Sequence, residues 1–145
     1  MEAIAIILIV WAAMLAASFW ESRVEGRNSW GRKKLGWKIK FGKYSLPEYH
    51  FWLFIVMFPL LVIILPLAID GWSLRLFGVL VSAYSVGLVL EDFGWFVVNP
   101  VVKMKEWDSK FADWYPWLKI KRFRFPIPYI IGILVAILSW ILFWR

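Results

Sequence analysis

Six side chains of the kind that bind metal ions stand near the ends of apolar stretches of this chain. Five are carboxylates and one is the only histidine: Glu21, Glu25, Glu48, His50, Glu91 and Asp92. Carboxylates together with one imidazole suit a hard or borderline divalent ion such as Mg, Mn, Fe or Zn. The start of a helix, where His50 falls, favours the neutral ring that binds metal. We predict a metal site with these ligands: Glu91 at the centre, and His50, Glu21, Glu25 and Asp92 around it.

Glu91 is the strongest candidate because it lies inside an apolar stretch. An ionisable group there is costly and is a functional hypothesis by default. Gly87, Glu91 and Gly94 share one helical face, so a neighbouring helix can approach closely. In the first apolar stretch, Ala13 and Ala17 lead to the first carboxylates at four-residue spacing, and we expect this small face to pack there. The side chains expected to support the ligands are Tyr84, Trp95 and Asn99.

Each of these residues also has a purely structural interpretation. Ser45 and Glu48 fit a capping box at a helix start. His50 can simply hydrogen-bond a backbone group at the membrane interface. The carboxylates can instead form ion pairs: Glu21 and Glu25 with Arg23, Arg27 or Lys33, and Glu91 and Asp92 with cytoplasmic lysines or arginines. If all of these interpretations hold, there is no site.

The residue types that are absent exclude several classes of site. The chain has no Cys, Thr or Gln and a single His. Without cysteine it can hold no Fe–S cluster or zinc thiolate, and one histidine cannot supply a bis-histidine haem. No phosphate-binding glycine loop, nucleophilic-serine motif or zinc-protease motif is present, so we expect no nucleotide cofactor. Few Asn and no Gln or Cys, with plentiful Lys, Arg and Ile, are typical of a thermophile, although chance in a short apolar chain gives the same composition.

The overall composition is that of a membrane protein. Of the 145 residues, 62% are hydrophobic and 19% charged, against about 45–50% and about 25% in soluble domains. Four apolar stretches, at 3–20, 51–69, 76–98 and 127–144, each approach the ~20 residues that cross ~30 Å of hydrocarbon. We predict an all-α membrane fold in which residues 1–145 form one domain, a bundle of four transmembrane helices.

The distribution of charge predicts how the bundle is oriented. Fifteen of the 17 lysines and arginines lie in ranges 21–50 and 99–126, and only Arg75 and Arg145 lie outside them. Because basic loops stay cytoplasmic, we predict a multi-pass protein of the cell membrane with both termini outside. Many of the 12 tryptophans lie near the ends of the stretches, as in interfacial belts. Topology thus explains the net charge of +7, and we expect contact with anionic lipid headgroups and not with nucleic acid.

The two basic loops carry short alternating patterns. Ranges 37–41, 118–121 and 123–125 alternate apolar and basic residues, which predicts short strands with one apolar face. These strands either pair with each other or lie separately on the membrane surface. The sequence shows no internal repeat, because Pro59 and Pro66 interrupt the second stretch whereas Pro126 and Pro128 open the fourth. The matching features that an inverted-repeat transporter needs are therefore missing.

Four local strings of residues carry a resemblance to a known group of proteins. They are ESRVEG at 21–26, EYHFW at 48–52, EDFGWFVVNP at 91–100 and WYPW at 114–117. Together they resemble a group of small uncharacterised four-span integral membrane proteins of prokaryotes. The string at 91–100 is the most specific part, and the likeness covers most of the chain. The resemblance implies the four-span architecture and no catalytic activity.

Two functional hypotheses follow from the sequence. In the first, the chain is a small polytopic membrane protein with a cytoplasm-facing intramembrane carboxylate and histidine site for a cation or metal. In the second, it is a non-catalytic structural or accessory subunit, with other membrane chains or copies of itself as partners. We lean against an enzyme, and if it is one, the metal activates water against a lipid or membrane-soluble substrate. If it is a transporter component, the same carboxylates bind and release an ion or a proton.

Overall fold

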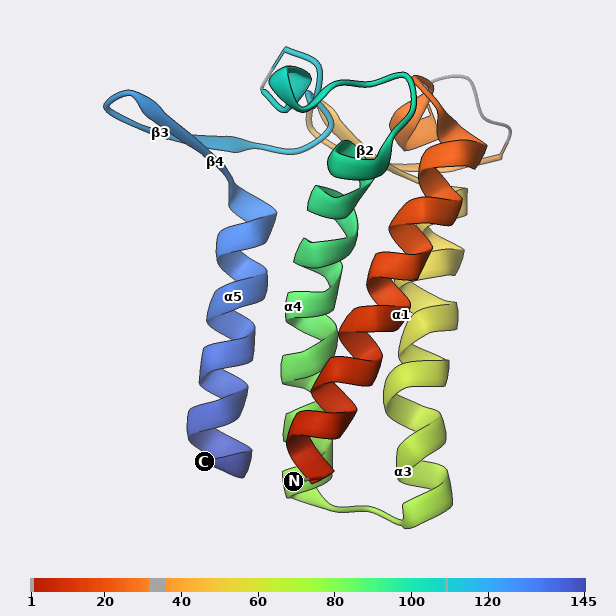
Figure 1. Ribbon diagram of the computed structural model, residues 1–145, viewed down its shortest axis with the longest axis vertical. Coiled ribbons are helices and arrows are strands. Elements are labelled where there is room, and N and C mark those ends of the chain that lie inside the picture. The colour runs from red at the N-terminus through yellow and green to blue at the C-terminus, as the bar shows by residue number, and fades with distance from the viewer. Residues whose placement is uncertain (1, 32–35, 109) are drawn as a thin grey trace.

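Four helices in the described part of the chain are long and apolar enough to cross a membrane (Figure 1). The computed structural model describes residues 2–31, 36–108 and 110–145. The four helices are Glu2–Glu25, Glu48–Asp70, Leu74–Val98 and Ile127–Trp144, close to the predicted stretches. The first helix runs further than predicted, because polar residues do not by themselves end a helix. It ends where Gly26 takes the left-handed conformation (φ 55°), so Glu21 and Glu25 lie on the helix itself.

Two of the four long helices contain wider, π-helical turns, and the other two are α-helical throughout. The second span consists of α2 (Glu48–His50), the π-helical η2 (Phe51–Met57) and η3 (Leu60–Ile64), and α3 (Leu65–Asp70). The fourth consists of α5 (Ile127–Ser139) and the π-helical η5 (Trp140–Trp144). The first and third spans are α1 (Glu2–Glu25) and α4 (Leu74–Val98). In the second span Pro59 and Pro66 lack a backbone donor, and local adjustment of this kind lets a membrane helix pass a proline.

The two halves of the chain repeat one order of elements. Each half runs from a long helix through a short 3-10 helix and a β-hairpin to a second long helix. The 3-10 helices are η1 (Ser29–Gly31) and η4 (Met104–Glu106), and the hairpins are β1 (Lys38–Phe41) with β2 (Tyr44–Pro47) and β3 (Trp117–Ile120) with β4 (Phe123–Pro126). In Figure 1 both hairpins lie at the end of the bundle opposite the two termini. The repeat that the sequence does not show is therefore present in the topology, and it is parallel and not inverted.

The predicted strands are confirmed, and each pairs within its own loop. Both hairpins turn through two residues, and Gly42 (φ 60°) and Lys121 (φ 52°) hold the first turn position in the left-handed region. The alternating pattern did not predict β2, because none of its residues carries a charge to mark the solvent face. Strands that are close in sequence pair at a lower entropic cost than strands from two separate loops.

Each hairpin passes directly into one of the long apolar helices through a buried proline. Pro47 and Pro126 end the two hairpins, and each following helix starts at the next residue. In both halves the first helical N–H donates to the carbonyl of the residue before the hairpin, at 2.9 Å. His50 and Tyr129, the third residues of the two helices, therefore occupy equivalent positions.

α1 and α4 form the central helix pair, and glycines on α4 allow their close approach. A Cβ added to Gly87 would come within 2.8 Å of Met14, and one added to Gly94 within 2.6 Å of Ser18. The Ser18 hydroxyl also donates to the backbone carbonyl of Glu91 at 2.8 Å. The predicted close contact at this face of α4 is confirmed.

The face of α1 in this contact is not the predicted alanine stripe. Ala13 is exposed and Ala17 only partly buried, whereas Met14 and Ser18 are fully buried. Small residues on both helices would leave a void, so the glycines of α4 are filled by larger side chains of α1. The buried face of α1 continues at Glu21, which carries the first carboxylate into the bundle.

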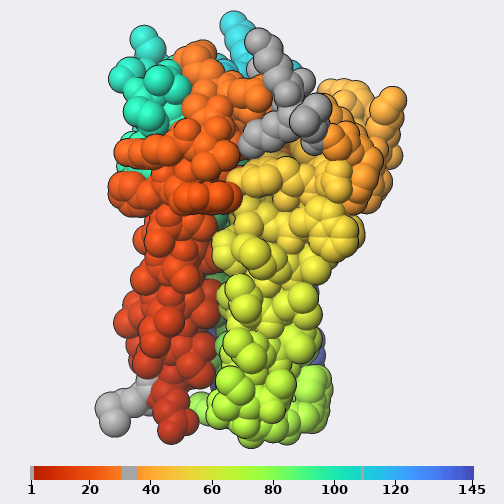
Figure 2. Space-filling view, turned by 90° about the vertical axis from the view of Figure 1, so that its right-hand side faces the viewer, coloured from red at the N-terminus to blue at the C-terminus, as the bar shows by residue number. Residues whose placement is uncertain are grey.

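The outer spans pack on this pair in different ways. α5 approaches α4 closely, since a Cβ added to Gly132 would lie 3.0 Å from the carbonyl oxygen of Ser85. The second span stands beside α1 (Figure 2), and its aromatic side chains Phe54 and Phe58 pack against the cluster around Met14. The second span is therefore held by large side chains and α5 by backbone proximity.

Candidate metal centre

Three of the predicted ligands meet between α1 and the start of the second span. The His50 Nε2 atom lies 3.4 Å from Glu21 Oε1 and 3.7 Å from Glu25 Oε1. One ligand atom from each residue lies within 4.8 Å of the other two. Ligand atoms that bind one ion at ~2.0–2.2 Å stand roughly 3–3.5 Å apart, so this trio is close to a coordinating arrangement. The three residues are 3%, 7% and 3% exposed for Glu21, Glu25 and His50.

The two carboxylates of α4 face the same small cavity. Glu91 and Asp92 line it together with the trio, and its volume of about 30 Å³ suits one ion or one water molecule. The carboxyl groups of Glu91 and Glu21 are adjacent across the α1–α4 interface. The structure thus brings all five predicted ligands to one cavity. The closest donor atoms, however, are those of the trio, and Glu91 forms the wall and not the centre.

Several polar atoms at this cavity are buried without a hydrogen bond. Glu21 Oε1, Glu91 Oε1 and His50 Nδ1 make no hydrogen bond, and the 3.4 Å contact of Glu21 Oε1 with His50 Nε2 is an ion-pair contact. Leaving a buried polar atom unpaired costs about 1–3 kcal/mol, and native structures contain few such atoms. Among the described residues no lysine or arginine forms an ion pair with Glu91 or Asp92. The predicted alternative of buried ion pairs is therefore not seen there.

Aromatic rings pack against the imidazole of His50. Its ring centroid lies 4.1 Å from that of Trp30 and 5.7 Å from that of Phe54. Trp30 has a left-handed backbone (φ 54°), and its indole N–H donates to the carbonyl of Ser45 at 2.6 Å. This conformation is unfavourable for a bulky residue, so the hydrogen bond and the ring contact hold Trp30 over the imidazole.

Asp92 is held from the side of α5 and the second loop. Its Oδ2 atom accepts a hydrogen bond from the hydroxyl of Tyr115 at 3.2 Å and another from the hydroxyl of Tyr129. Hydrogen bonds to a charged acceptor are stronger than those between neutral groups. Asp92 is therefore a positioned carboxylate that links α4 with α5.

Of the three supporting residues that the sequence predicts, one lies at the cavity. Trp95 lines it. Tyr84 donates to the carbonyl of Phe54 at 2.6 Å and not to Glu91. Asn99 accepts from two backbone N–H groups of the following turn at 2.9 Å, and its amide donates to the carbonyl of Gly26 at 3.1 Å. Asn99 therefore fixes the turn that follows α4 and ties it to the end of α1.

The predicted capping box is wrong. Ser45 lies in β2, and the residue that precedes the helix is Pro47. The Glu48 carboxylate instead accepts from the backbone N–H of Trp37 at 3.1 Å and from the indole of Trp52 at 3.3 Å. Pro47 has no side-chain hydrogen-bonding group that could cap the helix. The Glu48 carboxylate is bound by Trp37 and Trp52, so it supports the hairpin and lies outside the cavity.

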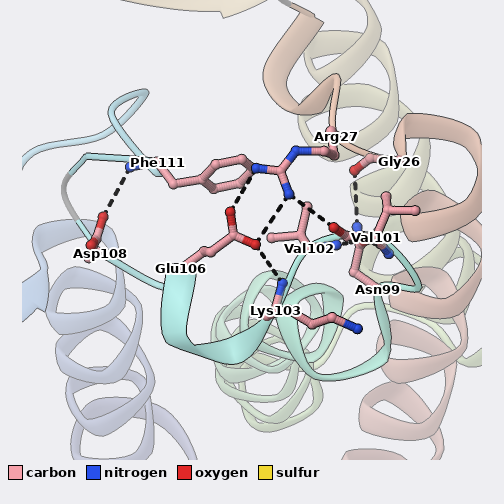
Figure 3. Close-up of polar contacts among 9 residues, drawn as sticks. All are labelled: Gly26, Arg27, Asn99, Val101, Val102, Lys103, Glu106, Asp108 and Phe111. Carbon is pink, nitrogen blue, oxygen red and sulfur yellow. Dashed lines mark hydrogen bonds and ion pairs between the residues drawn. The ribbon is translucent and has the colours of Figure 1, made fainter.

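The arginines at the end of α1 bind the second half of the chain (Figure 3). Arg27 forms an ion pair with Glu106 at 2.7 Å and donates to the carbonyl of Val101 at 3.0 Å. Arg23 donates to the carbonyl of Val98 at 2.6 Å. The predicted pairing of these arginines with the α1 carboxylates is therefore wrong, because the end of α4 offers them carbonyls and a carboxylate. Lys33, the third predicted partner, lies outside the described residues.

The ion pair of Arg27 with Glu106, called the clamp below, shifts the pKa of its carboxylate. Its guanidinium, helped by the backbone N–H of Lys103, lowers the pKa of Glu106 from 4.5 to about 2. The ring of Phe111 lies under the guanidinium at 5.2 Å, and Asp108 accepts from the Phe111 N–H at 3.0 Å (Figure 3). The clamp fixes the end of α1, and with it the two carboxylates there, against α4.

Three residues of the site region were not among the predicted ones. Trp30, Tyr115 and Tyr129 enclose the histidine and Asp92 from the loops and from α5. The string at 114–117 marks Tyr115 in the sequence, but nothing marks its contact with Asp92. For Trp30 and Tyr129 no local signal exists, because both contacts join segments that are distant in sequence.

Comparison of this chain with known proteins identifies no relative. No protein-family model, curated protein or solved structure matches it. The resemblance to small four-span proteins of prokaryotes stays a prediction, and function rests on the geometry alone.

Proposed function

We propose that this protein is a small integral membrane protein that binds a divalent metal ion through Glu21, Glu25 and His50, with Glu91 completing the site. The carrying observation is the convergence of three buried ligand atoms within 4.8 Å of one another. Charge supports it, since several carboxylates and one imidazole share a cavity without a lysine or arginine partner for Glu91 among the described residues. A cation offsets the cost of burying negative charge.

In this proposal the site opens toward the cytoplasmic face of the cell membrane. The ends of the bundle differ in charge, since fifteen of the 17 lysines and arginines lie in ranges 21–50 and 99–126, which contain the two hairpins. The positive-inside rule places those loops in the cytoplasm, next to anionic headgroups, and both termini outside. Borderline metals such as Fe, Mn or Zn fit the mixed imidazole and carboxylate donors better than Ca does.

Elemental analysis of the detergent-purified protein tests the proposal. After incubation with Mn²⁺, Fe²⁺ or Zn²⁺ and gel filtration, we expect about one ion per chain for one of these metals, retained against a weak chelator. His50→Ala and Glu25→Gln should lose the ion, and Glu91→Gln should weaken its retention. Glu48→Gln is the matched control, because Glu48 lies two residues from His50 but outside the cavity.

The outcome that overturns the proposal is equally direct. If wild type and His50→Ala retain the same amount of every metal, no metal is bound at this place. If in addition other membrane chains co-purify in fixed stoichiometry, the accessory-subunit hypothesis replaces it. Circular dichroism of each variant shows whether a loss of metal reflects a loss of fold.

A further inference from the structure

A second and larger hollow runs along the membrane-spanning part of α4. Its volume is about 460 Å³, within the range of about 300–1,000 Å³ that is typical of small-molecule sites. Its walls come from the second span, α4 and α5, at Phe54, Leu88 and Ile131 among others. At the floor, Gly132 brings α5 against the backbone of α4. These walls are apolar along most of their length, which suits a hydrocarbon chain.

One end of this groove is acidic and aromatic. The polar groups that line it there are the carboxylates of Glu91 and Asp92, the His50 ring and the hydroxyls of Tyr115 and Tyr129. The indole of Trp30 stands beside them. No lysine or arginine is among the described residues that line the groove. The end of the groove is thus built for a positive charge and against a negative one.

An unpaired buried atom points to a ligand at this end. Glu91 is 5% exposed, and its Oε1 atom has no hydrogen-bond partner. The neighbouring carboxylate, on Asp92, is already organised by two phenol hydroxyls that donate to the same Oδ2 atom. An ammonium group at this end would be attracted to both carboxylates and to the rings of Trp30 and Tyr115, which line the same groove.

We propose that the groove binds a single-chain amphiphile with an amine or quaternary ammonium head, whose tail lies along α4 and α5 and whose head meets Glu91 and Asp92. The occupant follows from shape and charge together: an apolar channel in the spans that ends on two carboxylates and an aromatic wall. A carboxylate or phosphate head would meet like charge at the same place. This site goes beyond the proposed metal site. It shares Glu91 with that site, but the head also meets Asp92 and the tail lies outside it, so binding of the amphiphile can be tested with the metal removed.

Retention of three amphiphiles with one chain and different heads tests the proposal. The wild-type protein in neutral lipid nanodiscs, with EDTA present, is incubated with hexadecylamine, hexadecanol or hexadecanoic acid, and bound ligand is quantified by native mass spectrometry. We expect the amine to bind at least ~10-fold more tightly than the acid, with the alcohol between them. Asp92→Asn should reduce the preference for the amine over the alcohol.

A pair of variants on α5 tests the place of the tail. Val135→Phe adds volume into the groove, whereas Leu134→Phe enlarges a residue that is 52% exposed and does not line it. The first should lower binding of both amine and alcohol, and the second should leave both unchanged. Neither residue is buried, so both variants should fold.

Specific results would overturn this inference. Equal binding of the three amphiphiles, or preference for the acid, rules out the acidic head site. Amine binding that is the same in Val135→Phe and Leu134→Phe rules out the groove. Because EDTA is present, these results do not depend on a metal. Loss of metal in His50→Ala, together with amine binding in the same variant that equals that of the wild type, would support both proposals separately.

Discussion

The two halves of this protein have one backbone plan and different chemistry at its equivalent positions. In the first half, the third residue of the second helix is His50, which contacts the carboxylates of α1. In the second half, the same position is Tyr129, which donates to the carboxylate of Asp92 on α4. Both halves therefore place a ring beside an acid of the preceding helix. The imidazole of His50 has a nitrogen that can bind a metal, whereas the hydroxyl of Tyr129 donates a hydrogen bond.

Under the proposed function, one scaffold serves metal binding in the first half and the positioning of a carboxylate in the second. The junction from hairpin to helix, with its proline and its 2.9 Å hydrogen bond, delivers the side chain to the same place in each half. The residue type at this position then decides its chemical role. An imidazole suits borderline metals, whereas a phenol holds a carboxylate in a fixed direction.

Replacing His50 by the residue type at the equivalent position of the second half should have the largest effect on metal retention. His50→Tyr puts a phenol at the equivalent position and removes the only nitrogen ligand. We expect at least ~100-fold weaker metal retention, measured by elemental analysis after dialysis. Retention equal to wild type in this variant would contradict the functional difference between the halves. Tyr129→His is the reciprocal variant and should leave the metal of the first half bound.

Removing the positioning hydrogen bond of the second half should affect stability and not metal. Tyr129→Phe leaves Asp92 with one phenol donor, Tyr115, in place of two. A hydrogen bond to a charged group contributes about 1.5–3 kcal/mol. We expect a lower unfolding temperature in detergent with metal content unchanged. An equal loss of metal in Tyr129→Phe and His50→Tyr would show that the two positions are not distinct in function.

The hairpin turns give a smaller and opposite pair of effects. Gly42 and Lys121 hold equivalent left-handed positions, and only glycine adopts this conformation without strain. We expect Lys121→Gly to stabilise the second hairpin and Gly42→Lys to destabilise the first, each by about 1 kcal/mol. Amide hydrogen exchange of the two hairpins checks both. Exchange that moves in the same direction in both variants would contradict the equivalence of the turns.

The exposed clamp between the halves should give the smallest effect, with a defined pH dependence. The pKa of Glu106 is lowered from 4.5 to about 2 in the folded protein. Its contribution to stability is therefore complete above pH 4.5 and is lost as the pH falls toward 2. Glu106→Gln should lower the unfolding temperature slightly at pH 7 and hardly at all at pH 2. Because the pair is exposed, the shift should also shrink in high salt, and a shift that grows at low pH would be the wrong sign.

The spans and the position of the acids could be predicted from the sequence, because hydropathy and charge act locally along the chain. The packing of α4 at Gly87 and Gly94 followed from helical spacing for the same reason. The face of α1 that packs on α4 could not be predicted in this way. Met14 fills the space beside Gly87, and this fit depends on the side-chain volumes of both helices together. The covering of His50 by Trp30 and the capture of Asp92 by Tyr129 depend on contacts between distant segments, which no local pattern marks.

The two halves, which repeat one order of elements, are joined by a short link between α3 and α4. Residues 71–73 form this link at the end of the bundle where the termini lie, opposite the hairpins (Figure 1). Each half begins at that end and places its own ring and acid by local connections. The molecule is thus divisible in principle: two separately expressed fragments, cut in this link, retain every element that shapes the site and should reassemble in a bilayer through the α1–α4 seam.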